Sequence, residues 1–171
     1  MRNKSTNFGN QLLNYLIMKR ILFILSLLIS SVLFAQDSFS EDDAKQVIDT
    51  FFKGFHKGDT IQMKSVILGN IATQTVFASK DGSNRIVDSM MDGFIKAIGS
   101  RPETDKWEER LLDYNVQIDG NLAHVWTPYE FWLNDKFSHC GANAFTLAKT
   151  DEGWKIVHLI DSRRRSSCKQ E

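Results

Sequence analysis

The sequence lacks every short motif that would name a reaction. Its 171 residues contain no Gly-rich phosphate loop, no His-Glu-x-x-His, no Cys-x-x-Cys and no Gly-x-Ser-x-Gly. The four His lie far apart on different predicted elements, so neither a metal site nor a cofactor is predicted. Any function therefore has to be sought in the predicted fold.

Proline is scarce and basic residues do not cluster. Only two Pro occur, the 10 Gly are scattered and no segment repeats, which excludes a linker and predicts one folded domain. The one basic cluster is Arg163-Arg164-Arg165, which is more typical of a solvated tail than of an anion site. Because binding to nucleic acid needs clustered Lys and Arg, no nucleic acid partner is predicted.

Residues 1–35 are typical of a secretory leader. Lys19 and Arg20 precede an uncharged apolar run over residues 21–34, and a small residue, Ala35, follows it. The run is shorter than the roughly 20 residues that span a bilayer. We expect a cleaved signal peptide, with an uncleaved membrane anchor as the alternative.

The leader prediction sets the boundaries of the mature protein. Met18 directly precedes Lys19, which makes residues 1–17 a candidate extension ahead of the true start. Residues 36–171 are the predicted single domain, in a periplasmic or secreted protein with no membrane association after the leader is removed. Without its leader the chain carries 17 basic and 21 acidic residues, a net charge of −4.

Two cysteines remain in the predicted mature domain. Cys140 and Cys168 are far enough apart to close a long loop, and disulfides persist in exported proteins. A disulfide and two free thiols both stay open at this point.

The first half of the domain predicts three helices and one strand. Ser40 begins a helix whose apolar stripe runs to Phe55, and Gly58 ends it. A short helix follows Asp59. The predicted strand covers residues 71–79, and a third helix covers residues 84–98, with Ile86, Val87, Met90, Met91, Phe94, Ile95 and Ile98 facing inward.

The second half predicts an antiparallel meander from Trp107 to Arg163. Its breaks contain the Gly, Asn and Asp that tight turns need, at Asp119-Gly120, Asn134-Asp135-Lys136 and Asp151-Glu152-Gly153. Helices followed by antiparallel strands predict an α+β domain, in which a curved, mainly antiparallel sheet wraps around the N-terminal helices as a cone-shaped barrel.

Residues 41–163 resemble the nuclear-transport-factor-2-like superfamily, which includes SnoaL-like and ketosteroid-isomerase-like proteins. The resemblance is carried by Phe51-Phe52 in the opening helix, the Gly58-Asp59 break, the strand at residues 123–126 and the closing segment at residues 151–158. The resemblance implies a pocket between helices and sheet and, commonly, a dimer through the outer face. Together with the predicted leader, it indicates an exported bacterial member. It implies no single activity, because fold alone does not fix function.

The predicted turns place the side chains on two faces. Aligned hairpins pair Thr127 with Asn143 and Phe145 with His158 on the inner face, and they leave no Asp or Glu there. An apolar floor with a few polar groups is typical of a small-molecule pocket. The predicted lining residues are Tyr114, Thr127, Tyr129, His139, Asn143, Phe145 and His158.

The outer face is unusually apolar for a solvent-facing sheet. Its predicted dimer contacts are Trp126, Trp132, Ala142, Ala144 and Leu159. A patch of this kind is larger than monomers normally expose, so we expect a homodimer.

Three functions fit these patterns. The favoured hypothesis is a binding domain for a small apolar molecule of unknown identity. One alternative is an isomerase-type or dehydratase-type enzyme in which His158 and Tyr129 are the candidate catalytic residues. The other is a protein-interaction module that uses the outer face of the sheet.

Overall fold

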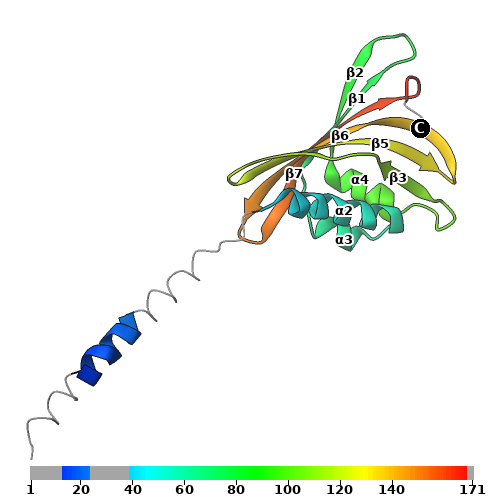
Figure 1. Ribbon diagram of the computed structural model, residues 1–171. Coiled ribbons are helices and arrows are strands. Elements are labelled where there is room, and N and C mark those ends of the chain that lie inside the picture. The colour runs from blue at the N-terminus through cyan, green and yellow to red at the C-terminus, as the bar shows by residue number, and fades with distance from the viewer. Residues whose placement is uncertain (1–12, 24–38, 169–171) are drawn as a thin grey trace, which may run out of the picture. The chain divides into compact units, whose positions relative to one another are not determined.

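The computed structural model describes residues 13–23 and 39–168 (Figure 1). Residues 13–23 are helical, and residues 39–168 belong to a separate compact unit. Within the described residues, no helix is both long and apolar enough to cross a membrane. Most of the predicted leader lies outside the described residues, so its cleavage stays a prediction.

The first two helices of the compact unit begin and end where the sequence predicts. In α2 (Glu41–Lys57), Ser40 Oγ accepts from the Asp43 N–H at 3.2 Å and the Asp43 carboxylate accepts from the Ser40 N–H at 2.8 Å. This reciprocal capping box stabilises the first turn. Gly58, with a φ of 72°, ends the helix. The short α3 (Thr60–Lys64) follows, capped by Asp59.

The segment before α4 (Met91–Gly99) is a strand, so the predicted helix over residues 84–98 is wrong in its first half. Strand β2 (Asn84–Met90) pairs antiparallel with β1 (Ala72–Ala78) through a turn in which Gly82 has a φ of 81°. Pairing with the edge of β1 outweighs the weak helical periodicity. Ile86, Val87 and Met90 consequently stay exposed instead of facing the core.

The remaining strands form the meander that the sequence predicts. They are β3 (Trp107–Leu111), β4 (Asn115–Asp119), β5 (Leu122–Leu133), β6 (Lys136–Thr150) and β7 (Gly153–Arg164). The sheet has seven strands in the order β2-β1-β7-β6-β5-β3, with β4 also paired to β5. Only β1 and β7 run parallel. The curved sheet wraps around the helices without closing, which confirms the predicted α+β fold (Figure 1).

The register of the central hairpin is as predicted. Thr127 pairs with Asn143 and Tyr129 with Gly141, around a turn in which Asn134 and Asp135 both have positive φ. The β4–β5 register is shifted by two residues, because Asp119 pairs with Leu122. A shift of two leaves every side chain on its predicted face.

Two irregularities change which side chains face inward. Between β3 and β4 the chain leaves the sheet, and as a result Glu109 shares the face of Phe131. On β7, Ile156 pairs with Leu147 but His158 pairs with Thr146, so Val157 is an extra, bulged residue. Every β7 side chain beyond this bulge lies on the face opposite to the predicted one.

The core lies between α2, α4 and the concave face of the sheet. Phe51 and Phe52 of α2 pack edge-on against Phe145 of β6, at 5.7 and 5.9 Å between ring centroids. Met63, Ile95, Ile98, Leu147 and Ile156 complete the buried cluster. This packing fixes the helices against the strands that carry the polar residues described below.

Candidate functional site

A cavity of about 580 Å³ lies between the helices and the concave face of the sheet. Its wall is largely aromatic, with Phe51, Phe52, Phe55, Phe94, Trp107 and Phe131 among the lining residues. Polar side chains from β1, β3, β5, β6 and β7 complete the lining. A cavity of this size, apolar with a few polar groups, is typical of a small-molecule site.

Glu109 is an acidic residue that lines the cavity. It lies on β3 and accepts a hydrogen bond from Asn143 Nδ2 at 2.7 Å. The pKa of Glu109 is raised to about 8, chiefly by removal from water. The nearby Asp161 contributes to this rise, and the Asn143 hydrogen bond opposes it. Glu109 is therefore mostly protonated at neutral pH and able to donate a proton or a hydrogen bond.

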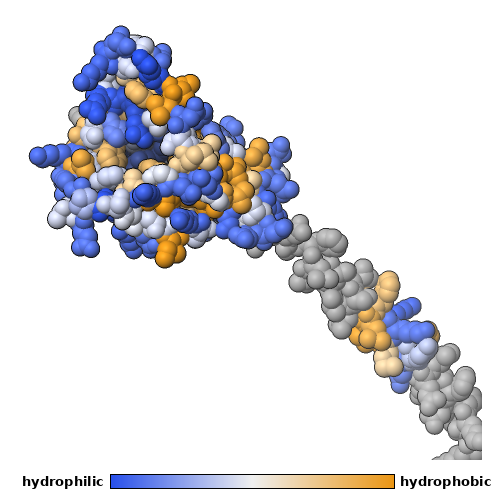
Figure 2. Space-filling model, turned by 180° about the vertical axis from the view of Figure 1, so that it is seen from behind, coloured by the Kyte–Doolittle hydropathy of each residue, from blue (hydrophilic) through white to orange (hydrophobic). Residues whose placement is uncertain are grey.

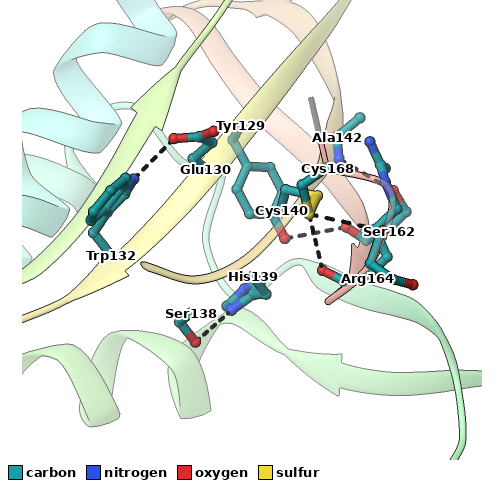
Figure 3. Close-up of a disulfide and its surroundings, with 11 residues drawn as sticks. Tyr129, Glu130, Trp132, Ser138, His139, Cys140, Ala142, Ser162, Arg164 and Cys168 are labelled. Carbon is teal, nitrogen blue, oxygen red and sulfur yellow. Dashed lines mark hydrogen bonds between the residues drawn. A yellow bond between two sulfur atoms is a disulfide. The ribbon is translucent and has the colours of Figure 1, made fainter. Parts of the chain in front are cut away.

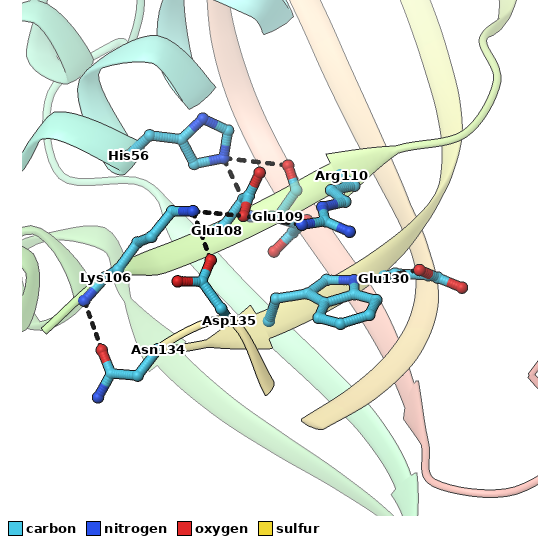
Figure 4. A network of polar contacts seen from close by, with 9 residues as sticks. His56, Lys106, Glu108, Glu109, Arg110, Glu130, Asn134 and Asp135 are labelled. Carbon is cyan, nitrogen blue, oxygen red and sulfur yellow. Dashed lines mark hydrogen bonds and ion pairs between the residues drawn. The ribbon is translucent and has the colours of Figure 1, made fainter. Parts of the chain in front are cut away.

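His56, in the last turn of α2, holds β3 in position (Figure 4). The backbone N–H of Glu109 donates to His56 Nε2 at 3.0 Å, and the Glu109 carbonyl oxygen lies at the same distance. Burial lowers the pKa of His56, which favours the neutral ring that this acceptor role requires. The edge strand thus has its backbone satisfied by a helix side chain.

An exposed ion cluster supports the same strand (Figure 4). Lys106 Nζ lies 2.6 Å from the Asp135 carboxylate and 3.3 Å from that of Glu108. Arg110 also pairs with Glu108, at 3.2 Å. Ion pairs exposed to water stabilise little by themselves, but these tie β3 to the β5–β6 turn.

Asp161 is the centre of a second polar group in the cavity wall. Its carboxylate accepts hydrogen bonds from Thr75 at 2.6 Å and from Tyr129 at 3.1 Å, and it pairs with Arg163 Nε at 2.7 Å. Burial and the negative Asp161 raise the pKa of Tyr129 above its usual value. Tyr129 is therefore a neutral donor committed to Asp161, and it is not a base.

His139 lies where the cavity meets the end of β7. Its ring packs on Phe131 at 4.9 Å and edge-on to Tyr129 at 5.9 Å between centroids. Burial and the positive Arg163 lower the pKa of His139 to about 4. His139 is thus neutral at physiological pH.

The structure brings only part of the predicted lining set to the cavity. Tyr129, His139 and Asn143 line it. Thr127 and Phe145 lie on the same face but are fully buried in the core. Tyr114 lies on the core side, where its hydroxyl donates to Asp49 of α2.

His158 does not face the cavity, contrary to the prediction. It pairs with Thr146, whose other partner across the sheet is His124, so it belongs to the outer face. The bulge at Val157 is the reason. A proton transfer between His158 and a ligand in this cavity is therefore excluded by position.

The predicted outer face is also corrected by the bulge. Leu159 lines the cavity, so it is not a dimer contact as predicted. Trp132 stays outside but is covered by Arg110, whose guanidinium lies 4.2 Å from the ring centroid. Ala142 and Ala144 are buried, whereas Trp126 is 46% exposed.

Cys140 and Cys168 form a disulfide with an S–S distance of 2.03 Å (Figure 3). Cys140 lies opposite Arg164 in the β6–β7 ladder, so the bond holds the segment after β7 against β6. Disulfides persist in oxidising compartments. The bond agrees with the predicted export, which itself stays a prediction.

Glu109, Asp161 and Arg163 are the site residues that sequence reasoning missed. For Glu109 a signal was present, because Trp107 and Leu111 alternate with polar Glu108 and Arg110 and place Glu109 on the apolar face. For Asp161 and Arg163 no such signal exists, because the bulge that turns them inward leaves the residue pattern of β7 unchanged.

A family model with the description "Putative lumazine-binding" matches residues 40–159. The chain belongs to this family. The match covers all three helices of the compact unit and the cavity-lining strands as far as Leu159 of β7, so it ends before Asp161 and Arg163. A comparison with curated proteins finds no significant match.

Solved structures place this lumazine-binding-like family member in the NTF2-like fold. An NTF2-like protein from Cytophaga hutchinsonii is 11% identical, with a TM-score of 0.57, covering 73% of this chain and 98% of that one. An NTF2-like superfamily protein from Salmonella enterica is 17% identical, with a TM-score of 0.55 and coverages of 74% and 92%. A "putative dehydratase" of the NTF2-like family from Streptomyces avermitilis is 12% identical, with a TM-score of 0.55 and coverages of 73% and 96%. At these identities the likeness shows the fold alone.

Proposed function

We propose that the domain binds a small, largely apolar molecule with at least one hydrogen-bonding group in the cavity. The observation that carries this proposal is the aromatic wall closed at one side by Glu109, Asn143 and Tyr129. Aromatic side chains stack on planar ligands, while a few polar groups fix their orientation. The family description, lumazine-binding, names a planar heteroaromatic compound and points the same way.

Trp107 supports a ligand with an acceptor atom. It lines the cavity, and its Nε1 is buried without a hydrogen-bond partner among the described residues. Buried donors are rarely left unpaired in native proteins. This N–H has almost no accessible surface, so an acceptor on a bound molecule can reach it only after the Trp107 ring turns towards the cavity.

The expected result of a thermal-shift screen is a raised unfolding midpoint with apolar carbonyl compounds or with pteridines such as lumazine. Gly93→Trp should abolish the shift, because Gly93 borders the cavity and a Cβ there meets no atom within 4 Å. Gly93→Ala is the matched control and should keep the shift. A wild-type midpoint that no compound moves would contradict the proposal.

Acid–base catalysis is the second candidate function, and Glu109 is the observation that favours it. A carboxylic acid with a pKa of about 8 in an apolar cavity can protonate a carbonyl or a leaving group near neutral pH. Glu109 thus takes the proton-transfer role that the sequence analysis suggested for His158. Assaying the compounds that shift the midpoint for turnover separates the two functions, since a pure binding domain returns each compound unchanged.

We also propose that the outer face of the sheet joins two copies of the chain. Trp126 is 46% exposed on this face, and Leu122, four residues earlier on the same strand and face, is 52% exposed. Seen from behind, hydrophobic patches interrupt the hydrophilic surface of the domain (Figure 2). Burial of such a patch against its own copy is the simplest way to remove it from water.

Light scattering after size exclusion is expected to give a dimer for the wild type and a monomer for Trp126→Glu, because a charge at the centre of an apolar interface stays unpaired. Ile61→Glu is the matched control. Ile61 is 82% exposed on α3, away from the sheet, and its replacement should leave the dimer intact. A monomeric wild type would end this claim.

A further inference from the structure

A second cavity, of about 590 Å³, lies between the β1–β2 hairpin and the end of β7. Its lining includes Phe77 of the hairpin and residues 163–166. Thr75, His139 and Arg163 line both cavities and therefore stand where the two meet. The two cavities therefore share part of their wall, and a ligand that occupies both would lie beside these residues.

The second cavity carries an excess of positive charge. Among the described residues that line it there are three Arg and no acid. Arg163 is neutralised by Asp161 at 2.7 Å. Within residues 39–168, neither Arg164 nor Arg165 has a carboxylate at salt-bridge distance. Arg164 pairs with Cys140, which pairs with Glu130 on the outer face, so the Arg164 side chain belongs to that face. Among the described lining residues, the Arg165 guanidinium is therefore left to face this space.

The acids of the aromatic cavity do not cancel this charge. Asp161 is already paired with Arg163, and Glu109, with a pKa of about 8, is largely neutral at pH 7. Asp105 interacts electrostatically with Arg101. The positive end of the combined space is thus at the end of β7.

The arginine segment is held in place by the disulfide. Cys168 returns to Cys140, which lies opposite Arg164 in the ladder, and Figure 3 shows both cysteines beside Arg164. The positive charges of Arg163 and Arg165 both contribute to the lowered pKa of His139, which locates these guanidinium groups near the imidazole. A fixed segment loses less conformational entropy when it binds a ligand than a free tail would.

We infer that Arg165 binds an oxyanion, so that the ligand is an aromatic acid with its ring in the first cavity and its anionic group in the second. This inference rests on the proposed function. A guanidinium group binds a carboxylate or a phosphate through two parallel N–H donors, which suits both anions. The sequence analysis interpreted the basic cluster at residues 163–165 as a solvated tail. In this inference the cluster contributes to anion binding.

Titration calorimetry at pH 7 with matched naphthalene compounds tests the inference. Naphthoate and naphthamide have nearly the same shape, but only naphthoate carries a charge. Naphthoate is expected to bind about tenfold tighter or more, and its affinity alone should fall as salt is added. Naphthyl phosphate is the third probe: a tighter fit than naphthoate assigns a phosphate, and a weaker one assigns a carboxylate.

Substitutions locate the anion. Arg165→Gln should lose about tenfold in naphthoate affinity and bind naphthamide like the wild type. Arg110→Gln removes one positive charge at a residue outside the cavities, and it is the control for a change in net charge. Cys140→Ala combined with Cys168→Ser releases the segment and should weaken naphthoate in the same way. Unchanged naphthamide binding shows in each case that the variant is folded.

The outcomes separate this inference from the proposed function. Equal affinities for naphthoate and naphthamide overturn the oxyanion site and leave the apolar cavity standing. A preference for naphthoate that survives Arg165→Gln also overturns it. If neither compound binds, the proposed function fails and the oxyanion site fails with it.

Discussion

Glu109→Gln is expected to stabilise the domain at pH 8 by about 3 kcal/mol and to have no effect at pH 4. The pKa of Glu109 is about 8 in the fold, against an ordinary value of 4.5. Between these values the folded chain keeps a proton that the unfolded chain has released, so raising the pH favours unfolding, by up to about 1.4 kcal/mol per pH unit. The uncharged amide of Gln removes this penalty and can still accept from Asn143.

The measurement is the free energy of unfolding of both proteins from pH 4 to 9. The difference between them isolates Glu109, because His139 has the opposite effect in both. Its pKa is lowered to about 4, so between pH 4 and its ordinary value of 6.5 stability rises with pH. Glu108→Gln is the control, since the Glu108 pKa is lowered, chiefly by its hydrogen bond to Arg110. Parallel curves for wild type and Glu109→Gln would refute the raised pKa.

Gly141→Ala is expected to destabilise the domain by about 3 kcal/mol or more. A Cβ on Gly141 would lie 1.7 Å from the Ser162 carbonyl oxygen and 2.8 Å from Cε1 of Tyr129. The first contact is with backbone, so relief requires β6 and β7 to separate where Gly141 pairs with Arg163. Glycine at this position is what lets Tyr129 lie flat enough to reach Asp161.

Urea unfolding measures this effect, with Gly93→Ala as the matched control. A Cβ on Gly93 meets no atom within 4 Å, and Ala is favoured over Gly in a helix such as α4. The control should therefore equal or exceed the wild type in stability. A Gly141→Ala protein within about 0.5 kcal/mol of the wild type would show that the strands yield easily at this point.

The fold could be predicted because its determinants are local. Ser40, Gly58 and the Asn134-Asp135 turn fix their elements through their own backbone preferences, whichever way the rest of the chain packs. The helix predicted for residues 84–90 was wrong because the conformation of this segment depends on pairing with the free edge of β1. Such a partner is not visible in a short stretch of sequence.

The candidate site could be predicted only where the ladders are regular. Tyr129, His139 and Asn143 were placed at the cavity because β5 and β6 pair without interruption from Phe131 back to Leu122. His158 was misplaced because backbone bonds of Ile156 to Val66 and Leu68 pull β7 into contact with another segment next to the bulge. The alternation of polar and apolar residues along β7 does not reveal that contact.

The extra residue at Val157 has a consequence for chemistry across related chains. The bulge turns the imidazole of His158 outward and turns the carboxylate of Asp161 and the guanidinium of Arg163 towards the cavity. The functional groups along the strand stay the same. Two relatives with the same composition along this strand, one with the inserted residue and one without it, would offer different reagents to the same substrate. The insertion or deletion of a single hydrophobic residue in this strand can therefore change which reactive groups line the cavity, while the fold stays the same.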